Sequence, residues 1–291
     1  MSDYSVLDRL LHRLALGFRP LAELSFDLEQ RLIRPDPGLA DRRHVFVTGL
    51  ARSGSTILLR RLYAAGGFRS LTYRDMPFVL APGLWGRLTR IDPARAEASE
   101  RAHGDRLVVD VDSPESFDEV FWRIKCGGSY VFHDHLRPHR PGRATLADYR
   151  GLVAAILASS QGEGVRYLAK NNNNLLRLPA LAEAFPQALI LIPFREPLAQ
   201  ARSLQRQHVR FLEMQAGNRF VRNYMVWLGH HEFGQAHKPF RFPDMQRDGS
   251  RYQNPGQLNY WLAAWVEAYT WLMRMAPENA QFVCYETLCA D

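Results

Sequence analysis

Short apolar runs alternate along this chain with stretches in which apolar residues recur at helical spacing. Three of the runs are each followed by a helical pattern: 44–49 before 55–65, 165–170 before 174–185, and 188–194 before 197 to about 214. The first run stops at Gly49, the second at Lys170, and the third immediately before Arg195. Repeated strand and helix units of this kind predict an α/β fold with a central parallel sheet flanked by helices.

Segments at both ends of the chain predict further elements around this sheet. Residues 5–33 have a helical pattern that breaks at Pro20. A helical pattern over 256–275 and an apolar run at 281–286 predict one more helix and one more strand.

The stretch 77–160 follows the alternating pattern less regularly. It contains a predicted strand at 106–112, a predicted helix at 114–125 and a loop rich in Pro, His and Arg. We interpret residues 1–291 as a single domain in which 1–41 is an N-terminal helical extension. The stretch 77–160 is then a helical and irregular insertion over the site, and it contributes to the acceptor-binding surface.

Composition narrows the class of protein without selecting a ligand. With 46% hydrophobic and 23% charged residues among 291, the chain can bury the core of one large α/β domain. The excess of 37 Lys and Arg over 30 Asp and Glu gives a net charge of +7, which attracts anions of any kind. Three cysteines without zinc-type spacing predict neither a disulfide framework nor a structural metal, and we expect a reducing, cytoplasmic location.

The N-terminal residues form no continuous apolar run of the length of a signal peptide or a membrane span. The stretch from Val6 to Leu16 nevertheless has leucines at helical spacing, with Arg9 and Arg13 between them. This pattern allows peripheral membrane contact through a basic amphipathic helix, although it favours a helix packed on the domain.

The segment from Gly49 to Thr56 has the spacing of a phosphate-binding loop, with two glycines five residues apart at the start of a helix. Ser55 stands where the P-loop of a kinase requires lysine. Backbone N–H groups and the positive end of the helix dipole still form an anion cradle without that lysine. Arg52 is the predicted replacement for the missing cation.

The residue after the run 188–194 is a second departure from a kinase. Kinases and NTPases hold Mg²⁺ partly through an acid at the end of a neighbouring strand. Here Arg195 follows the strand, and it repels Mg²⁺ and attracts a second anionic group. The two departures predict metal-free binding of a nucleotide with a phosphate on its ribose as well as on its 5′ side. In the simple alternatives, Arg52 caps local carbonyl groups and Arg195 pairs with Glu196.

These motifs resemble those of the superfamily of sulfotransferases that use 3′-phosphoadenosine 5′-phosphosulfate (PAPS), in its bacterial branch. The family's 5′-phosphosulfate loop is similar to Arg52, Ser53, Gly54, Ser55 and Thr56, and its 3′-phosphate motif is similar to Arg195 and Ser203. The resemblance covers 44–76 and 165–213, and 281–288 looks like the family's late strand with its Tyr-Glu-x-Leu element. Members usually continue into a further 3′-phosphate-binding segment, so either another region substitutes here or the sequence is a piece of a longer chain.

The resemblance implies a P-loop-NTPase-like fold, PAPS as co-substrate, no metal, and transfer of the sulfuryl group to a hydroxyl or, less favoured, an amine. A carbohydrate or glycolipid acceptor is the preferred interpretation, and no nucleic acid partner is expected. The insertion and the aromatic, basic segment 211–251 are predicted to select the acceptor. Two alternatives stay open: an NTP-dependent kinase with a degenerate P-loop, and a non-catalytic binder of anionic ligands.

Sulfuryl transfer requires cations at the leaving phosphate and a base that takes the acceptor's proton. Arg52 and Lys170 are predicted for the leaving side, although Lys170 is equally consistent with a surface lysine. The resemblance implies as base either a histidine shortly after that lysine or a glutamate downstream of the loop. Asn172 occupies the histidine position, and an amide does not accept a proton at neutral pH. Our predicted base is therefore Asp75, the next acid after the helix of the loop.

Other acids and histidines are weaker candidates for the base, namely His208, Asp110, Asp112, His133 and His135. An ion pair with the neighbouring Arg74 is the structural alternative for Asp75. His230 and His231 stand beside Glu232, but adjacent histidines of a helix point about 100° apart. We therefore predict no metal site there.

Overall fold

A computed structural model of the chain describes residues 6–89, 99–100, 108–109, 112, 114–160, 162, 164–243 and 254–290. At its centre lies a sheet of five parallel strands in the order β2-β5-β1-β6-β7. The strands are β1 (Val45–Val47), β2 (Phe68–Arg69), β5 (Arg166–Lys170), β6 (Leu189–Phe194) and β7 (Ala280–Cys284). The predicted α/β fold, with a P-loop-like central parallel sheet flanked by helices, is confirmed.

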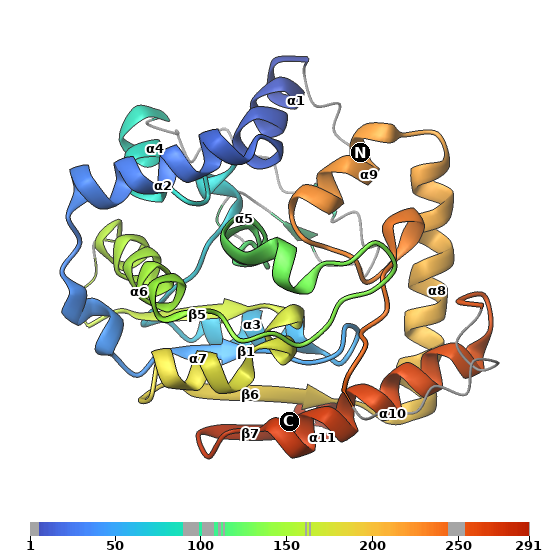
Figure 1. The fold of residues 1–291 in the computed structure, drawn as a ribbon. Helices are drawn as coiled ribbons and strands as arrows, with labels where there is room; N and C mark the ends of the chain where they lie inside the picture. The colour runs from blue at the N-terminus through green and yellow to red at the C-terminus, as the bar shows by residue number, and fades with distance from the viewer. Residues whose placement is uncertain are drawn as a thin grey trace.

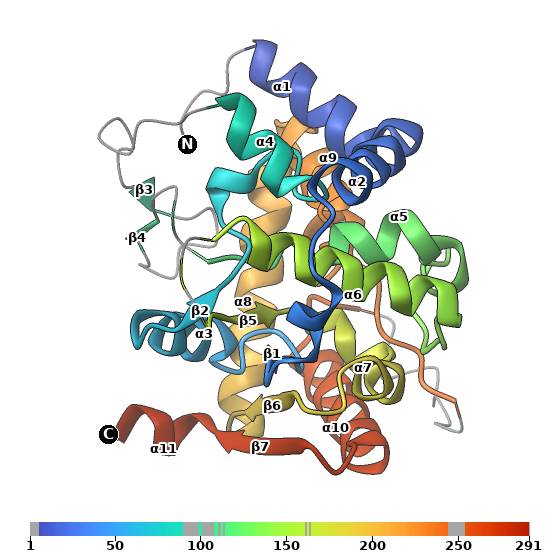
Figure 2. The ribbon, with the colours of Figure 1, turned by 90° about the vertical axis from the view of Figure 1, so that its left-hand side faces the viewer.

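Helices cover both faces of the sheet. Figure 2 shows α3 and α11 on one side and α6, α7 and α10 on the other. Their bounds are α3 (Ser55–Ala64), α11 (Tyr285–Ala290), α6 (Arg143–Ala158), α7 (Leu178–Ala184) and α10 (Leu258–Met275). The chain alternates between strand and helix at the positions that the sequence predicts for β1, β5, β6, α3 and α10.

Side chains that alternate along each strand point into two separate cores. Along β1, Val45 and Val47 pack with the leucines of α3, whereas Phe46 joins the larger core on the opposite face. Along β6, Leu191 belongs to the first core and Ile190 to the second. Because both faces are covered, the strands read as continuous apolar runs and not as alternating ones.

The helix α8 (Pro197–Ala216) stands beside the carboxyl ends of the strands and packs against α10 (Figure 1). It follows β6 directly, so the predicted helix from 197 to about 214 is confirmed. The helix α9 (Arg219–Trp227) comes next in the chain. This arrangement surrounds the carboxyl edge of the sheet, where parallel α/β folds bind their ligands.

The N-terminal helical prediction is also confirmed. The chain forms α1 (Val6–His12), a π-helical turn (Arg13–Gly17) and α2 (Arg19–Ile33), with the break at Phe18 just before the proline. Glu29 belongs to α2 and is fully buried, and its carboxylate accepts the backbone N–H groups of Gly83 and Leu84 at 2.8 and 2.9 Å. It thereby caps α4 (Pro82–Thr89), because a carboxylate is favourable at a helix N-terminus.

Leucines on the outer side of α2 remain in solvent. Leu24, Leu28 and Leu32 recur every four residues and are 51%, 40% and 62% exposed. No helix in the described ranges combines the length and the apolar character needed to cross a membrane. Peripheral membrane contact through the N-terminal helices stays a prediction.

The stretch 77–160 is more regular than its sequence pattern indicates. The predicted helix at 114–125 begins later, as α5 (Glu119–Tyr130). Of the predicted strand at 106–112, Val108–Val109 forms β4, paired antiparallel with β3 (Ser99–Glu100), and Asp110 lies outside the described residues.

The helix α6 was not predicted from the sequence. Residues 152–157, with the sequence LVAAIL, are all buried against α2, α5 and the sheet. A helix enclosed on several sides carries no polar face, so its apolar residues lack the 3.6-residue period by which helices are recognised.

Acidification is expected to destabilise the fold through His44, which is fully buried just before β1. Its Nδ1 accepts the backbone N–H of Tyr167 at 3.0 Å, and burial lowers its pKa from 6.5 to about 4. Between those values the unfolded chain binds a proton that the folded chain does not, so the free energy of unfolding falls as the pH drops.

Urea titrations between pH 6.5 and 4.5 test this expectation. This pH range lies between the pKa values of His44 in the unfolded and folded chain. The variant His44→Asn keeps an acceptor for the Tyr167 N–H but does not titrate there. It should lose less stability on acidification than the original chain. Equal pH slopes in the two proteins would show that His44 does not contribute.

Candidate active site

The loop between β1 and α3 adopts a backbone that few residues allow. Gly49 and Gly54 have φ angles of 143° and 90°, and Arg52 has a φ of 65°. A β-carbon on Gly54 would lie 2.3 Å from the ring of Tyr285, so glycine is required there for space as well as for conformation. Leu58 N–H is bonded to the Gly54 carbonyl at 3.0 Å. The N–H groups before it in α3 have no acceptor within the helix and are available to an anion.

Gln200 of α8 holds the loop in this shape. The side chain is fully buried, and its Nε2 donates to the carbonyl oxygen of Ala51 at 2.9 Å, while its Oε1 accepts from Trp265 Nε1 at 3.0 Å. The hydroxyl of Tyr269 donates to the carbonyl oxygen of Pro193 in β6 at 3.0 Å. The helix α10 therefore fixes the loop and the end of β6 together. A single glutamine in a helix carries no motif, and the sequence analysis did not identify it.

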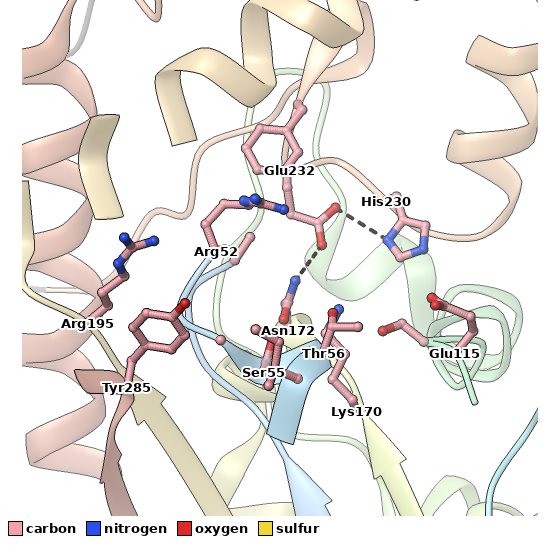
Figure 3. A pocket seen from close by; sticks show the side chains of 15 residues that line it. Arg52, Ser55, Thr56, Glu115, Lys170, Asn172, Arg195, His230, Glu232 and Tyr285 are labelled. Carbon is pink, nitrogen blue, oxygen red and sulfur yellow. Dashed lines mark hydrogen bonds and ion pairs between the residues drawn. The ribbon is translucent and has the colours of Figure 1, made fainter. Parts of the chain in front are cut away.

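A cavity of about 230 Å³ lies beside the loop, where the chain leaves β1, β5 and β6. Its lining comprises Ala51, Arg52, Gly54, Ser55, Thr56, Ile57, Glu115, Ser116, Lys170, Asn172, Arg195, His230, Glu232, Phe233 and Tyr285. Figure 3 shows Arg195 and Tyr285 on one side of this cavity and His230 and Glu115 on the other, with the loop residues between them. The cavity thus has one end lined by an arginine and another lined by a histidine and a carboxylate.

Most residues predicted to bind the donor line this cavity, namely Arg52, Gly54, Ser55, Thr56, Lys170 and Arg195. The other two, Ser53 and Ser203, are not among its lining residues, and neither is the predicted base Asp75. Ser203 is nevertheless connected to it, because its Oγ accepts a hydrogen bond from Arg52 Nε at 3.0 Å. The two predicted phosphate motifs, 151 residues apart, therefore contact each other directly.

Arg195 reaches the cavity from the end of β6. Its guanidinium group lies over the ring of Tyr285, 4.8 Å from the centroid, and its Nε is buried without a hydrogen-bond partner among the described residues. The alternative pairing with Glu196 is not observed. That carboxylate caps α8 instead, accepting the N–H groups of Leu198 and Ala199 at 2.9 and 2.6 Å. Arg195 is therefore positioned by an aromatic ring and keeps donors for an anion.

Lys170 ends β5 and is 8% exposed, so it is not a surface lysine. The four asparagines that follow it are buried, and two of them fix the chain locally. Asn171 Oδ1 accepts the N–H of Asn173 at 2.9 Å, and Asn173 Nδ2 donates to the carbonyl oxygen of Gly229 at 3.1 Å. The tract therefore ties the end of β5 to the segment that carries His230 and Glu232.

A buried ion pair holds the first asparagine of this tract in place. Arg177 is 1% exposed, and its two terminal nitrogens donate to the two carboxylate oxygens of Glu119 at 2.9 and 3.0 Å. Glu119 also accepts from Asn171 Nδ2 at 2.8 Å and from the hydroxyl of Tyr130. Burial and the neighbouring Glu119 raise the pKa of Tyr130 well above its ordinary value, so that hydroxyl stays a donor. The network joins α5 to the chain that follows β5.

Asp75, the predicted base, lies in a short 3₁₀ turn (Tyr73–Asp75) and is 4% exposed. Its carboxylate accepts from Arg69 at 2.6 Å and from the backbone N–H of Thr72 at 2.8 Å in a capping box. The alternative pairing with Arg74 is not observed, because Arg74 binds Asp112 through two bonds of 2.7 Å. The arrangement accounts for Asp75 as a structural residue, and its role as base stays a prediction without support from its position.

The weaker candidates for the base also lie elsewhere. His208 is buried and accepts the Gly234 N–H at 3.2 Å, and His135 stacks on a phenylalanine ring. Asp112 is committed to Arg74, and His133 is not part of the cavity lining. Within the described ranges, no cluster of three or more His, Cys, Asp or Glu side chains could hold a metal ion.

Two carboxylates and a histidine that were not predicted from the sequence as site residues also line the cavity. Glu115 precedes α5, and His230 and Glu232 lie in the loop after α9. The sequence contains only a weak signal for them, since a His-His-Glu string occurs in many surface loops. Their common feature, proximity to the loop of β1, arises only in the folded chain.

The family model described as "Sulfotransferase family" matches residues 44–243 of the chain, which is more than half of its 291 residues. No curated protein matches the chain in sequence.

The solved structures that are similar to this chain include three bacterial sulfotransferases. A sulfotransferase from Mycobacterium tuberculosis is 14% identical, with a TM-score of 0.47 over 99% of this chain and 74% of that one. One from Mycobacterium avium is 13% identical, with a TM-score of 0.43 over 96% and 80% of the two chains. One from Alicyclobacillus acidocaldarius is 16% identical, with a TM-score of 0.37 over 86% and 76%.

Proposed function

This chain belongs to the sulfotransferase family, and we propose that it transfers the sulfuryl group of PAPS to a hydroxyl group of an acceptor. The observation that carries the choice of donor is Arg195. It stands at the strand end where a kinase places its Mg²⁺-binding acid, it lines the cavity, and it makes no ion pair within the described ranges. A cation at that position suits a second anionic group on the nucleotide.

The cavity offers two separate places for negative charge. The first turn of α3 and Arg52 surround the position of a 5′-phosphosulfate, and Lys170 lines the same region. Arg195 stands on the far side with Tyr285 (Figure 3). In this assignment the 5′ group binds at the loop and the 3′-phosphate binds at Arg195.

The reaction is an in-line displacement at sulfur. The acceptor oxygen attacks the sulfur atom, the bond from sulfur to the bridging phosphate oxygen breaks, and that oxygen keeps the electron pair. Arg52, Lys170 and the loop N–H groups are placed to stabilise the charge that develops on the leaving phosphate. A carbohydrate or glycolipid acceptor remains our preferred choice, and Glu115, Ser116 and Phe233 are lining residues of the cavity that the donor assignment does not use.

Calorimetry with three nucleotides tests the choice of donor. We expect 3′-phosphoadenosine 5′-phosphate (PAP) to bind more tightly than either ATP with Mg²⁺ or adenosine 5′-phosphate. The variant Arg195→Ala should weaken PAP binding about 10- to 150-fold, because a hydrogen bond to a charged group contributes about 1.5–3 kcal/mol. Its affinity for adenosine 5′-phosphate, which lacks the 3′-phosphate, should hardly change.

Tighter binding of ATP with Mg²⁺ than of PAP would instead favour the kinase. If no nucleotide binds, the chain is better described as a binder of other anions, and its affinity for a sulfated glycan should then fall steeply with salt. An equal loss of affinity for PAP and adenosine 5′-phosphate in Arg195→Ala would place Arg195 near the 5′ group.

A further inference from the structure

His230, Glu232 and Asn172 contact one another along one wall of the cavity, through one ion-pair contact and one hydrogen bond. His230 Nδ1 lies 3.4 Å from Glu232 Oε2, and Asn172 Nδ2 donates to Glu232 Oε1 at 2.9 Å. Figure 3 shows both interactions, with the imidazole at the opposite side of the cavity from Arg195. The carboxylate is thus held by an amide on one oxygen and faces an imidazole with the other.

This wall favours an ionised carboxylate. Glu232 has a side chain only 12% exposed. Burial by itself raises the pKa of Glu232, but the charge of His230 when its ring is protonated, the hydrogen bond from Asn172 and the charge of Lys170 outweigh that effect and hold the pKa well below its usual range. An ionised Glu232 at 3.4 Å from Nδ1 favours a proton on that nitrogen when the ring is neutral, and the lone pair of the imidazole is then on Nε2.

The second ring nitrogen of His230, Nε2, is not the one that contacts Glu232. Nε2 lies on the side of the ring away from Glu232 (Figure 3), and no side chain or backbone group in the described part of the chain bonds to it. The charged groups around the ring are Glu232 on its own loop, Glu115 before α5, Lys170 at the end of β5 and Arg52 of the phosphate loop.

We propose that His230 is the general base of the transfer reaction, with Glu232 and Asn172 as positioning residues. The proposal rests on the proposed function and adds the group that accepts the proton. As the acceptor oxygen bonds to sulfur, its hydrogen moves to His230 Nε2, and the bridging oxygen leaves with PAP. The imidazolium that forms lies against the Glu232 carboxylate, which stabilises its charge.

The amide at position 172 takes part in this arrangement without accepting a proton. Asn172 cannot act as a base, but it orients the carboxylate that orients His230. His230 therefore reaches the site from a different loop, 58 positions after Asn172 in the sequence. Glu115 lines the same end of the cavity and is the competing base.

Matched variants separate these two bases. Turnover of PAPS to PAP is measured with methyl glucoside as a generic acceptor, whose hydroxyl groups stay protonated near neutral pH, and with water alone. His230→Gln is expected to lower turnover about 10²- to 10⁴-fold. Its PAP affinity should stay within about threefold of the original, since a general base acts on the acceptor and not on the nucleotide. Added imidazole should restore part of the activity.

Glu232→Gln tests the positioning role. It preserves the shape of the side chain but removes the charge, so we expect a reduced kcat, unchanged PAP affinity and an altered His230 tautomer. Nitrogen NMR of histidine-labelled protein bound to PAP reads that tautomer without any acceptor, and the His230→Gln spectrum assigns the signal. The expected form in the original chain carries its proton on Nδ1.

Each outcome decides the proposal. A proton on Nε2 of His230 in the neutral ring, or normal turnover in His230→Gln, overturns it. A loss of turnover in Glu115→Gln with His230→Gln unaffected assigns the base to Glu115. Failure of the original chain to bind PAP is a different result, because it refutes the proposed function and not the choice of base alone.

Discussion

Replacing Arg52 by alanine is expected to lower PAPS turnover about 10³- to 10⁵-fold, the range for an arginine that stabilises a transferring phosphoryl group. Arg52 lines the cavity, replaces the P-loop lysine, and is held by its Nε bond to Ser203. Under the proposed function its charge would meet the leaving phosphate in a fixed geometry, which is the condition for a large electrostatic contribution. Initial rates of PAP release measure the effect, and calorimetry with PAP separates it from binding.

Two variants give this experiment its controls. Arg61→Ala removes the same side chain from the exposed end of α3 and should leave turnover within about twofold, as surface substitutions away from a site usually do. Ser203→Ala removes the bond that orients Arg52, so its loss of turnover should be intermediate. Activity in Arg52→Ala equal to that of the control would place the leaving-group charge elsewhere, with Lys170 as the remaining cation beside the loop.

Replacing Arg177 by methionine is expected to reduce the free energy of unfolding by about 3–5 kcal/mol, since it leaves a buried charge unpaired. Glu119 loses both guanidinium bonds, although the Tyr130 hydroxyl and Asn171 still donate to it. Methionine keeps most of the apolar contact that the arginine stem makes with its neighbours, so the loss reports on charge more than on volume. Urea unfolding monitored by tryptophan fluorescence measures it.

The matched control is Arg140, whose pair with Glu183 has the same chemistry in solvent, with side chains 75% and 45% exposed. Arg140→Met should cost less than about 1 kcal/mol. Combining Arg177→Met with Glu119→Gln should recover part of the stability, because the unpaired charge is then removed as well. If Arg177→Met behaves like the control, the buried pair does not support the fold.

The buried pair also connects stability to the site. Glu119 holds Asn171, and the next residue, Asn172, holds Glu232 at the cavity wall. A variant that loosens this chain is expected to misplace the carboxylate as well as to weaken the fold. Comparing turnover of folded Arg177→Met with its stability would separate the two effects.

The central architecture could be predicted from local patterns. The runs before Gly49, Lys170 and Arg195 became β1, β5 and β6, because short apolar stretches bounded by turn or charged residues favour buried parallel strands. The same reasoning failed for α6, whose enclosed residues show no amphipathic period. It also misplaced the start of α5, because Pro114 is followed by two residues of the N-cap type, Ser116 and Asp118, and the helix begins after the second.

The sequence by itself determined the anion cradle and the cations around it. The glycine spacing, Ser55 in place of lysine and the arginine after β6 are local features, and the carboxyl ends of neighbouring parallel strands bring such features to one edge. Those residues line one cavity in the folded chain. The prediction that they bind a nucleotide with two anionic groups rests on their charge and on the missing P-loop lysine.

Only the tertiary structure decided which groups stand opposite the cradle. Asp75 follows the loop closely in sequence, yet Arg69 and Thr72 hold its carboxylate away from the cavity lining. Glu232 lies 60 residues from the asparagine that holds it, and no spacing rule predicts such a contact. The reason is physical, because local patterns report only the direction of a side chain relative to its own helix or strand. A proton acceptor is defined instead by distances between atoms of segments that meet only when the chain folds.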